Sequence, residues 1–374
     1  MIQNKILLVY VEPTPYIVGL IHALVDIWPG EIDVVFLCEN LSQQWNVAVN
    51  KEWRILPKNK FKQFYLLSRL ILKNNYQLVH LAGWGNLLFV WAIFFSYSNG
   101  IPVSLESDTP LPAQQSFLKK IIKYFIYPRL FKRVRIFLPG GQRQAKYFNF
   151  YGVNNEQIVP AQMTVDVAQI KKYIGNLSDH DRFDMRQRLG IKNDSITFLY
   201  VGRLVEQKGL SDLIAAFENL KDKKVTLLIA GDGNMRSRIE EIAKNSANII
   251  YAGRLSDHEL LNAYFSADIV VLPSHFEPWG LVVNEAMAVG KPVVVSDKVG
   301  CIDDLVIPYE TGLIVKSKCA TSLQEALEYM CDNDNHLSMG KNAAQLIKSW
   351  TLENEARTMC YAWEQFTTRP RNDG

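Results

Sequence analysis

The sequence predicts an α/β protein with two doubly wound parallel sheets. Short apolar strands alternate with longer helical segments along the 374 residues. This alternation is typical of parallel sheets covered by helices on both faces. The length allows two domains, each with its own core. The hydrophobic content of 48% and the charged content of 21% are those of a soluble globular enzyme.

The amino-terminal half contains five apolar segments short enough to be strands. They are expected at Ile6–Val11, Asp33–Leu37, Leu78–Leu81, Val103–Glu106 and Ile136–Leu138. Helices expected between them include Ile17–Ile27, Phe61–Asn74 and Leu87–Ser98. Residues 160–190 are rich in polar turn signals, so we place the crossing into a second unit there.

The second unit repeats the same alternation. Its strands are expected at Thr197–Val201, Val225–Ala230, Ile249–Tyr251, Ile269–Leu272 and Val293–Val295. Ser256 and Glu259 form a capping-box pattern that predicts the start of a helix reaching about Phe265. The predicted domains are residues 1–165 and 166–351, followed by a last helix within 352–374.

Targeting signals and cysteine usage predict a cytoplasmic protein. The first apolar strand follows Met1–Lys5 without a cleavage site, and the longest apolar run, Leu87–Phe95, is shorter than a membrane span. The five cysteines are scattered and lack metal-ligand spacing, which favours reduced thiols.

The net charge of +3 hides an asymmetry between the two halves. Residues 1–180 carry 19 lysines and arginines against 11 acidic residues, whereas the remainder carries 22 against 27. Much of the excess lies in residues 117–135, where basic and aromatic residues alternate. This segment predicts either contact with an anionic membrane surface or a helix that packs on the sheet with solvated lysines. No recognition motif for nucleic acid accompanies the charge.

Residues 268–297 are the most informative stretch. An apolar strand leads into a loop with Glu277, a helix opens at Trp279-Gly280-Leu281, and Glu285 lies one turn into it before a second strand. In such a βαβ unit, ligands bind beyond the carboxyl ends of the strands. The amides at the helix start suit an anion. The segment therefore predicts phosphate on the amides and sugar hydroxyls on the two carboxylates.

A second loop supplies cations. Residues 201–209 run from a strand through Gly202-Arg203 to Lys208-Gly209 ahead of a helix at about Asp212–Leu220. Arg203 is suited to bidentate phosphate binding, and Lys208 adds a compact charge.

The string Glu277-Pro278-Trp279-Gly280-Leu281-Val282-Val283-Asn284-Glu285 closely resembles the donor-binding signature of the retaining glycosyltransferases of family four. The Gly-Arg…Lys-Gly pattern of residues 202–209 resembles the same family. The resemblance implies the GT-B architecture, in which two Rossmann-like domains face each other across a cleft and the last helix crosses back onto the first domain.

Site roles follow from the resemblance. Glu285 is expected to bind the nucleotide ribose, and Glu277, with the amides of Trp279, Gly280 and Leu281, the hexose and phosphate. Arg203 and Lys208 are expected to hold the diphosphate, and Arg254 and Leu255 to edge the base. Gly231 and Gly233 either admit the nucleotide closely or simply form turns. We expect no metal to be required, and retention of configuration is implied by the resemblance alone.

The first domain departs from the family pattern. Residues 11–19, with Tyr16 and Gly19, replace the usual Gly-Gly loop, and Ala82 stands where many members have the second His of a His-x-His motif. His80 is therefore a structural or a catalytic candidate. Glu106 and Asp108 follow the next strand, and Asp108 is a candidate to orient the acceptor hydroxyl. The tentative acceptor side is Tyr16, Gly19, His80, Glu106 and Asp108, and the catalytic candidates are Glu277, Arg203, Lys208 and Asp108.

The predicted function is transfer of a sugar from a UDP- or GDP-linked donor to a hydroxyl of a glycan or lipid-linked acceptor, in cell-surface polysaccharide or glycan synthesis. The predicted location is the cytoplasm, with peripheral contact at the inner membrane face. Two alternatives stay open: a sugar-nucleotide epimerase, and a non-catalytic nucleotide-sugar-binding partner of another transferase. A nicotinamide dehydrogenase is disfavoured because no Gly-x-Gly-x-x-Gly follows the first strand.

Overall fold

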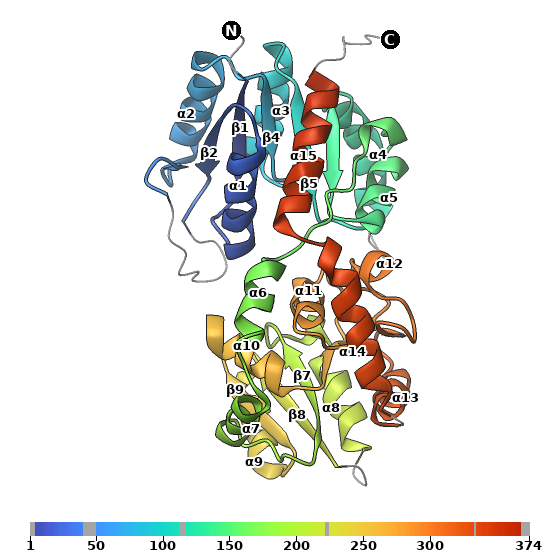
Figure 1. Cartoon of the computed structure of the whole chain (residues 1–374). Helices are drawn as coiled ribbons and strands as arrows, with labels where there is room; N and C mark the ends of the chain where they lie inside the picture. Colours follow the sequence, from blue (N-terminus) through green and yellow to red (C-terminus); the bar gives the residue numbers. More distant parts are fainter. Residues whose placement is uncertain (1–3, 40–49, 112–116, 221–223, 333, 368–374) are drawn as a thin grey trace. The chain divides into compact units, whose positions relative to one another are not determined.

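The computed structural model describes residues 4–39, 50–111, 117–220, 224–332 and 334–367, with the side chains of 117–119 and 367 outside the description. The chain divides into two compact units (Figure 1). The first comprises residues 1–163 and 352–374, and the second residues 164–351. These boundaries lie two residues or fewer from those expected at 165/166 and 351/352.

In the described part of the chain, each unit has one six-stranded sheet, and its neighbouring strands pair in parallel. In the first, the order is β3 (Arg54–Ile55), β2 (Glu31–Phe36), β1 (Lys5–Tyr10), β4 (Leu78–Leu81), β5 (Val103–Ser107), β6 (Ile136–Pro139). In the second, the order is β12 (Gly312–Val315), β11 (Val293–Ser296), β10 (Ile269–Leu272), β7 (Ile196–Val201), β8 (Val225–Ala230), β9 (Ile249–Gly253). The predicted doubly wound α/β class is confirmed.

Two of the four edge strands, β3 and β12, were not predicted. β3 is two residues long and exposed, so it has no apolar run to detect. β12 follows a turn and pairs along one side only, with β11. The other strands lie within a few residues of their expected positions.

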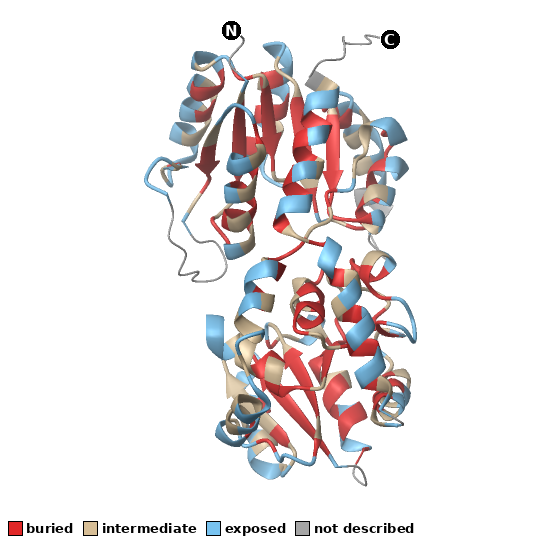
Figure 2. Ribbon diagram, viewed as in Figure 1, coloured by how far each residue is buried: buried red, intermediate tan, exposed pale blue. Residues whose placement is uncertain are grey.

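Helices cover both faces of the first sheet. On one face, α1 (Pro15–Ile27) and α15 (Leu352–Thr367) pack against Ile6, Leu8 and Tyr10. On the other, α2 (Lys60–Lys73), α3 (Leu87–Ser98), α4 (Phe117–Phe131) and α5 (Gln142–Phe150) enclose a second core. The strands between these layers are almost entirely buried (Figure 2). No described helix is long and apolar enough to cross a membrane.

The helices of the second unit follow the same scheme. They are α6 (Val167–Ile174), α7 (Asp179–Arg188), α8 (Leu210–Glu218), α9 (Arg236–Asn245), α10 (Asp257–Ser266), α11 (Leu281–Ala288), α12 (Ile302–Leu305), α13 (Ala320–Cys331) and α14 (Asn335–Leu346). Residues of α8, α9 and α13 share one core with the sheet. The predicted capping box of α10 is present, with the Ser256 amide donating to Glu259 at 3.3 Å.

Residues 160–190, expected to contain polar turns, hold the helices α6 and α7. The missed signal is a second capping box, in which Ser178 and Asp181 satisfy each other's backbone amides at the start of α7. Because α7 is short and has few apolar residues, its sequence shows no clear helical periodicity.

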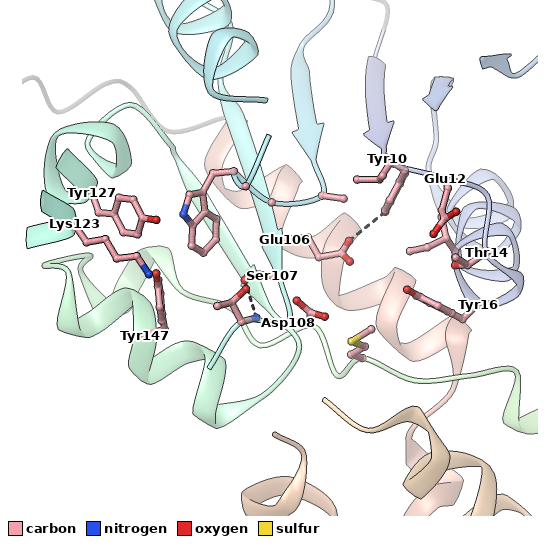
Figure 3. Close-up of a pocket in the computed structure, with 18 residues that line it drawn as sticks. Tyr10, Glu12, Thr14, Tyr16, Glu106, Ser107, Asp108, Lys123, Tyr127 and Tyr147 are labelled. Atoms are coloured by element: carbon pink, nitrogen blue, oxygen red, sulfur yellow. Dashed lines mark hydrogen bonds between the residues drawn. The ribbon is translucent and has the colours of Figure 1, made fainter. Parts of the chain in front are cut away.

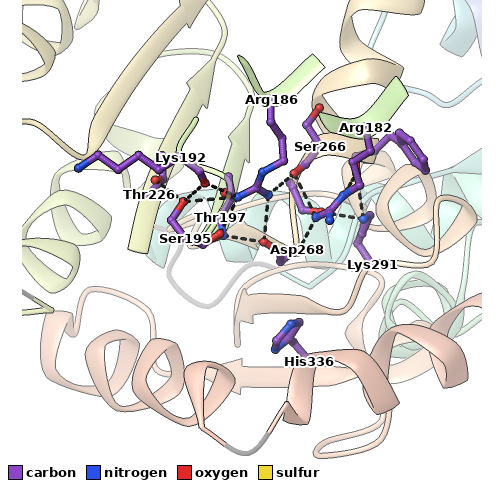
Figure 4. Close-up of polar contacts among 12 residues, drawn as sticks. Arg182, Arg186, Lys192, Ser195, Thr197, Thr226, Ser266, Asp268, Lys291 and His336 are labelled. Atoms are coloured by element: carbon purple, nitrogen blue, oxygen red, sulfur yellow. Dashed lines mark hydrogen bonds and ion pairs between the residues drawn. The ribbon is translucent and has the colours of Figure 1, made fainter. Parts of the chain in front are cut away.

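A buried polar cluster ties α7 to the amino end of β10 (Figure 4). Asp268 accepts from Arg182 at 2.6 Å and from the Thr197 amide at 2.8 Å. Lys291 donates to the Ala267 carbonyl at 2.7 Å, and burial, reinforced by the charge of Arg182, lowers the pKa of Lys291 to about 8. The cluster joins β7, β10 and α7 at the edge of the sheet opposite the carboxyl ends.

The strand order places a topological switch point in each sheet, between β1 and β4 and between β7 and β10. Ligands of doubly wound sheets bind outside the carboxyl ends of the strands at such points.

Candidate active site

In the second unit, the loops after β7 and β10 are in direct contact at the switch point. A Cβ on Gly209, whose φ is +71°, would lie 2.1 Å from the Pro273 carbonyl oxygen, so only glycine fits. The His275 amide donates to the Gln207 carbonyl at 2.8 Å. The His275 ring lies 2.6 Å from Asp212 of α8, which adds a side-chain tie. These contacts hold residues 203–209 against residues 273–277.

Lys208 and Glu277 form an ion pair across these loops. Each side chain is only 15% exposed. Ser274 also donates to the Glu277 carboxylate, at 3.4 Å. The pair brings together the cation and the first carboxylate that the sequence predicts for the site. Arg203, by contrast, is exposed at the carboxyl end of β7, where its guanidinium is accessible to an anion.

Helix α11 begins immediately after Glu277. Gly280 caps it with φ +108°, and an added Cβ would meet Val299 at 2.9 Å. The first amides of a helix have no partner within it, so those following Gly280 are suited to a phosphate. Leu281 is the first residue of α11 and contributes by its backbone.

The Trp279 side chain has a structural role. It is 2% exposed, and its indole donates to Asn284 at 3.0 Å. Asn284 in turn donates to Thr164 at 3.2 Å, and Thr164 donates to the Trp350 carbonyl at 2.9 Å. This buried chain anchors the start of α11. The expected contact of Trp279 with the donor involves its backbone amide, so it is compatible with this packing of the side chain and stays a prediction.

Glu285 lies on α11 with its carboxylate accepting from Tyr264 of α10 at 2.6 Å. Burial disfavours the ionised form and raises the pKa of Glu285 to about 7, while the hydrogen bond from Tyr264 opposes this shift. Glu285 thus changes charge near neutral pH, and its charged form is stabilised by any further hydrogen-bond donor. The hydroxyls of a sugar are such donors.

Glycines 202, 231 and 233 allow two loops to cross. A Cβ on Gly231 would lie 1.8 Å from the Gly202 carbonyl oxygen, and one on Gly233 would lie 2.4 Å from that of Leu204. The chain's own backbone therefore requires both glycines, which favours the turn interpretation. Arg254 is exposed and Leu255 half-buried directly after β9, two strands away from β7.

In the first unit, a pocket of about 460 Å³ lies at the carboxyl ends of β1, β4 and β5 (Figure 3). It is lined by Tyr10, Val11, Glu12, Thr14, Tyr16, Ile17, Ala82, Gly83, Trp84, Gly85, Glu106, Ser107, Asp108, Thr109, Lys123, Tyr127, Tyr147 and Met163. Three of the five acceptor-side residues, Tyr16, Glu106 and Asp108, are brought together here. Burial raises the pKa of Tyr16 to about 12, so its phenol stays neutral.

Glu106 is held from behind by a buried network. Its carboxylate lies 3.2 Å from the Tyr10 hydroxyl and 3.2 Å from Nε2 of His80. Nδ1 of His80 lies 3.1 Å from Ser104, which also accepts from the Trp363 indole at 3.0 Å. An ionised Glu106 requires the proton on Nε2 of His80, so that Nδ1 accepts from the Ser104 hydroxyl. The network therefore presents Glu106 to the pocket as an oriented acceptor.

Of the two roles left open for His80, the structure favours the structural one, because the ring is fully buried, does not line the pocket and positions Glu106. The prediction of Gly19 on the acceptor side needs correction. Gly19 lies on α1 facing α15, where a Cβ would be 2.7 Å from Leu352, so it serves helix packing. The sequence pattern places His80 in the predicted strand, but it does not show which residues of neighbouring elements contact the ring.

Several important residues carry no local sequence signal. Tyr264, Asp212 and His275 become relevant only because the parallel topology brings distant loops together. Lys123 and Tyr127 lie in the basic-aromatic segment, where only a membrane or packing role was expected, and Tyr147 lies on α5. Among the described residues, no group of His, Cys, Asp and Glu side chains is arranged to hold a metal ion.

Residues 181–346 match the model of the family described as glycosyl transferases group 1. This segment is similar to the group 1 glycosyl transferases. It lies within the second unit and contains the Lys208–Glu277 pair, α11 and Glu285. The predicted resemblance to glycosyltransferases is confirmed for it.

Among curated relatives, an uncharacterized glycosyltransferase of Methanocaldococcus jannaschii is 36% identical over 152 residues, covering 40% of this chain and 39% of that protein. An N,N'-diacetylbacillosaminyl-diphospho-undecaprenol alpha-1,3-N-acetylgalactosaminyltransferase of Campylobacter jejuni is 28% identical, covering 62% and 61%. The matches thus span less than two thirds of these relatives.

A solved structure of Anabaena HepE in complex with UDP matches nearly the whole chain. The TM-score is 0.77 at 17% sequence identity, with coverage of 96% of this chain and all of that one (100%). At this identity the likeness shows the fold, two Rossmann-like domains of the GT-B type.

Replacement of Glu285 by Gln tests the titration of this carboxyl. Because its pKa is raised from 4.5 to about 7 in the native state, its stabilising contribution is complete below pH 4.5 and is lost as pH rises through 7. We expect the free energy of urea unfolding to fall by about 2–3 kcal/mol more in wild type than in Glu285→Gln across this range. If the free energy of unfolding depends on pH in the same way in both proteins, Glu285 does not have the raised pKa.

Proposed function

We propose that this protein is a glycosyltransferase that moves a sugar from a UDP- or GDP-linked donor to an acceptor hydroxyl with retention of configuration. The observation that carries the proposal is the arrangement at the β7/β10 switch point. This site combines Lys208, Glu277 and the start of α11. Glu285 lies further along the same helix. A phosphate, a sugar and a ribose each have a matching group in this arrangement.

In the proposed reaction, the bond between the anomeric carbon and the diphosphate oxygen breaks, and a bond to the acceptor oxygen forms. Negative charge grows on the departing diphosphate, and the proton of the acceptor hydroxyl passes to that diphosphate. Arg203, Lys208 and the first amides of α11 stabilise that charge where it develops, without reorganisation. Glu277 and Glu285 accept hydrogen bonds from the hydroxyls of the hexose and the ribose, respectively.

The Lys208–Glu277 pair explains how the site is kept ready before the donor binds. Two charges that are each 15% exposed are costly unless they are paired. When a diphosphate arrives, it offers Lys208 a second anionic partner. The Glu277 carboxylate then has capacity for sugar hydroxyls, since a carboxylate accepts several hydrogen bonds.

Relatives support the choice of substrates. The HepE structure holds UDP, and the name of the Campylobacter jejuni transferase describes an acceptor linked to diphospho-undecaprenol. We accordingly propose that the donor is a nucleotide sugar, that no metal is required, and that the product belongs to a cell-surface polysaccharide or another glycan. The proposed location is the cytoplasm.

We further propose that α4 contacts the inner face of an anionic membrane. In the described part of α4, Ile122, Tyr124, Phe125 and Ile126 are more than half exposed, at 56%, 62%, 57% and 53%. Lys120 and Lys132 are exposed beside them. Apolar side chains at this exposure, interleaved with cations, suit the interface of an anionic bilayer. Lys119 lies outside the described side chains.

A thermal-shift panel with UDP, GDP, ADP, CMP and NAD tests the donor site. We expect UDP or GDP to stabilise wild type by about 2.7 kcal/mol at a hundredfold its dissociation constant. Glu285→Ala should lose most of this effect, whereas Glu241→Ala, on the exposed surface of α9, should keep it. Stabilisation by NAD alone, or by no nucleotide, would refute the proposed donor.

Vesicle co-sedimentation tests the membrane contact. The double variant Lys120→Glu/Lys132→Glu should lose about tenfold or more in binding to phosphatidylglycerol vesicles, since each cation near the surface contributes about 1 kcal/mol. A matched variant, Lys192→Glu/Lys244→Glu, changes the charge equally in the second unit. Equal binding of both variants would show that α4 makes no such contact.

A further inference from the structure

The pocket of the first unit has two chemically different ends (Figure 3). Glu12, Glu106 and Asp108 give one side an acidic character. The other end is formed by Lys123 and the aromatic rings of Trp84, Tyr127 and Tyr147. An acceptor sugar has hydroxyls that suit the acidic side, but it offers nothing that requires a cation at the far end.

Lys123 is poorly compensated by protein groups. Its ammonium lies 5.6 Å from the centre of the Tyr127 ring, and among the described residues no carboxylate forms an ion pair with it. The sequence around it supplies no acidic residue between Asp108 and Glu156. Within residues 53–155, Glu106 and Asp108 are the only acids, against 15 lysines and arginines. The positive charge at the aromatic end of the pocket therefore favours binding of an anion over binding of a neutral group.

The tyrosines at this end are donors. Burial, together with the neighbouring Tyr127 and Tyr151, raises the pKa of Tyr147, so its phenol remains protonated. Trp84 is 9% exposed and packs edge-on against Tyr127, with ring centres 6.0 Å apart. A protonated phenol and an ammonium together match the oxygens of a phosphate.

An apolar stripe of α4 continues from Lys123 to the outside. Ile122, Phe125 and Ile126 occupy positions one, four and five of the same two turns, and each is more than half exposed. Residues at this spacing lie on one face of a helix. An acyl or prenyl chain leaving the cationic end of the pocket would find this stripe directly beside Lys123.

We propose that the acceptor is a lipid-linked phosphate or diphosphate whose phosphate binds Lys123 and Tyr147. Its tail then lies along Ile122, Phe125 and Ile126, and its sugar extends toward Glu106 and Asp108. This assignment rests on the proposed glycosyltransferase function and names the acceptor class. The opposite orientation is excluded by repulsion, because it would set a phosphate against three carboxylates.

The orientation gives Glu106 a defined task. Tyr10 and His80 hold one carboxylate oxygen, and the side chain is 16% exposed. Glu106 therefore accepts from an acceptor hydroxyl in a single geometry. Lys123 determines which molecules enter, and Glu106 determines which hydroxyl is presented.

Calorimetric binding of three probes to the full-length protein tests the proposal: farnesyl diphosphate, farnesol and inorganic pyrophosphate. Saturating UDP is included so that a diphosphate cannot occupy the donor site. We expect farnesyl diphosphate to bind at least tenfold more tightly than either other probe. Lys123→Gln should weaken it tenfold or more, Lys123→Arg should retain most of the affinity, and Lys62→Gln on α2 should leave it unchanged.

Each other result overturns the assignment. Pyrophosphate binding as tightly as farnesyl diphosphate would indicate a site for a free anion. Farnesol binding as tightly would show that Lys123 recognises no phosphate, and an equal loss in Lys123→Gln and Lys62→Gln would indicate diffuse charge. If UDP fails to bind, the donor proposal fails separately, and the same titrations without UDP still test the acceptor site.

Discussion

The ion pair between Lys208 and Glu277 is the interaction on which the second unit's site depends. It joins the loop after β7 to the loop after β10, 69 residues apart in sequence. Its two charges are largely withdrawn from water, so removing one partner leaves the other partly buried without a counter-charge. Glu277 precedes the Gly280 cap of α11 by three residues, so the pair lies close in sequence to the start of that helix.

The same topology produces a second site in the first unit, with different chemistry. In both sheets the strand order changes direction beside the first strand, at β1 and at β7. Both sheets place polar residues beyond the carboxyl ends of the strands at that point. In the first unit those residues are carboxylates and phenols, and they are supported through His80 and Ser104 by Trp363 of α15. The last helix of the chain thus contributes to the geometry of a pocket formed by the first 163 residues.

Sequence reasoning predicted what depends on local pattern. Alternating apolar segments located the inner strands, and the uninterrupted string from Glu277 to Glu285 located the donor loop. It could not predict the partners of those residues. Tyr264 approaches Glu285 and Ser104 approaches His80 only because parallel strands align distant segments. Gly19 was assigned to a ligand site because its position in the sequence cannot distinguish a residue that packs from one that binds. The pocket end at Lys123 was missed because basic and aromatic residues at helical spacing suggested a surface.

Turnover of a nucleotide sugar by Lys208→Met tests most directly whether this ion pair is the centre of a transferase site. Release of the nucleoside diphosphate from the preferred donor would be followed in wild type, Lys208→Met and Lys298→Met. The Lys298 variant removes a cation that pairs with Asp297 in the neighbouring loop after β11. Our account predicts a loss of about a hundredfold or more in kcat/KM for Lys208→Met, the usual effect of removing one group that stabilises transition-state charge. Lys298→Met should remain within a few-fold of wild type. Turnover by Lys208→Met equal to that of Lys298→Met would contradict the account.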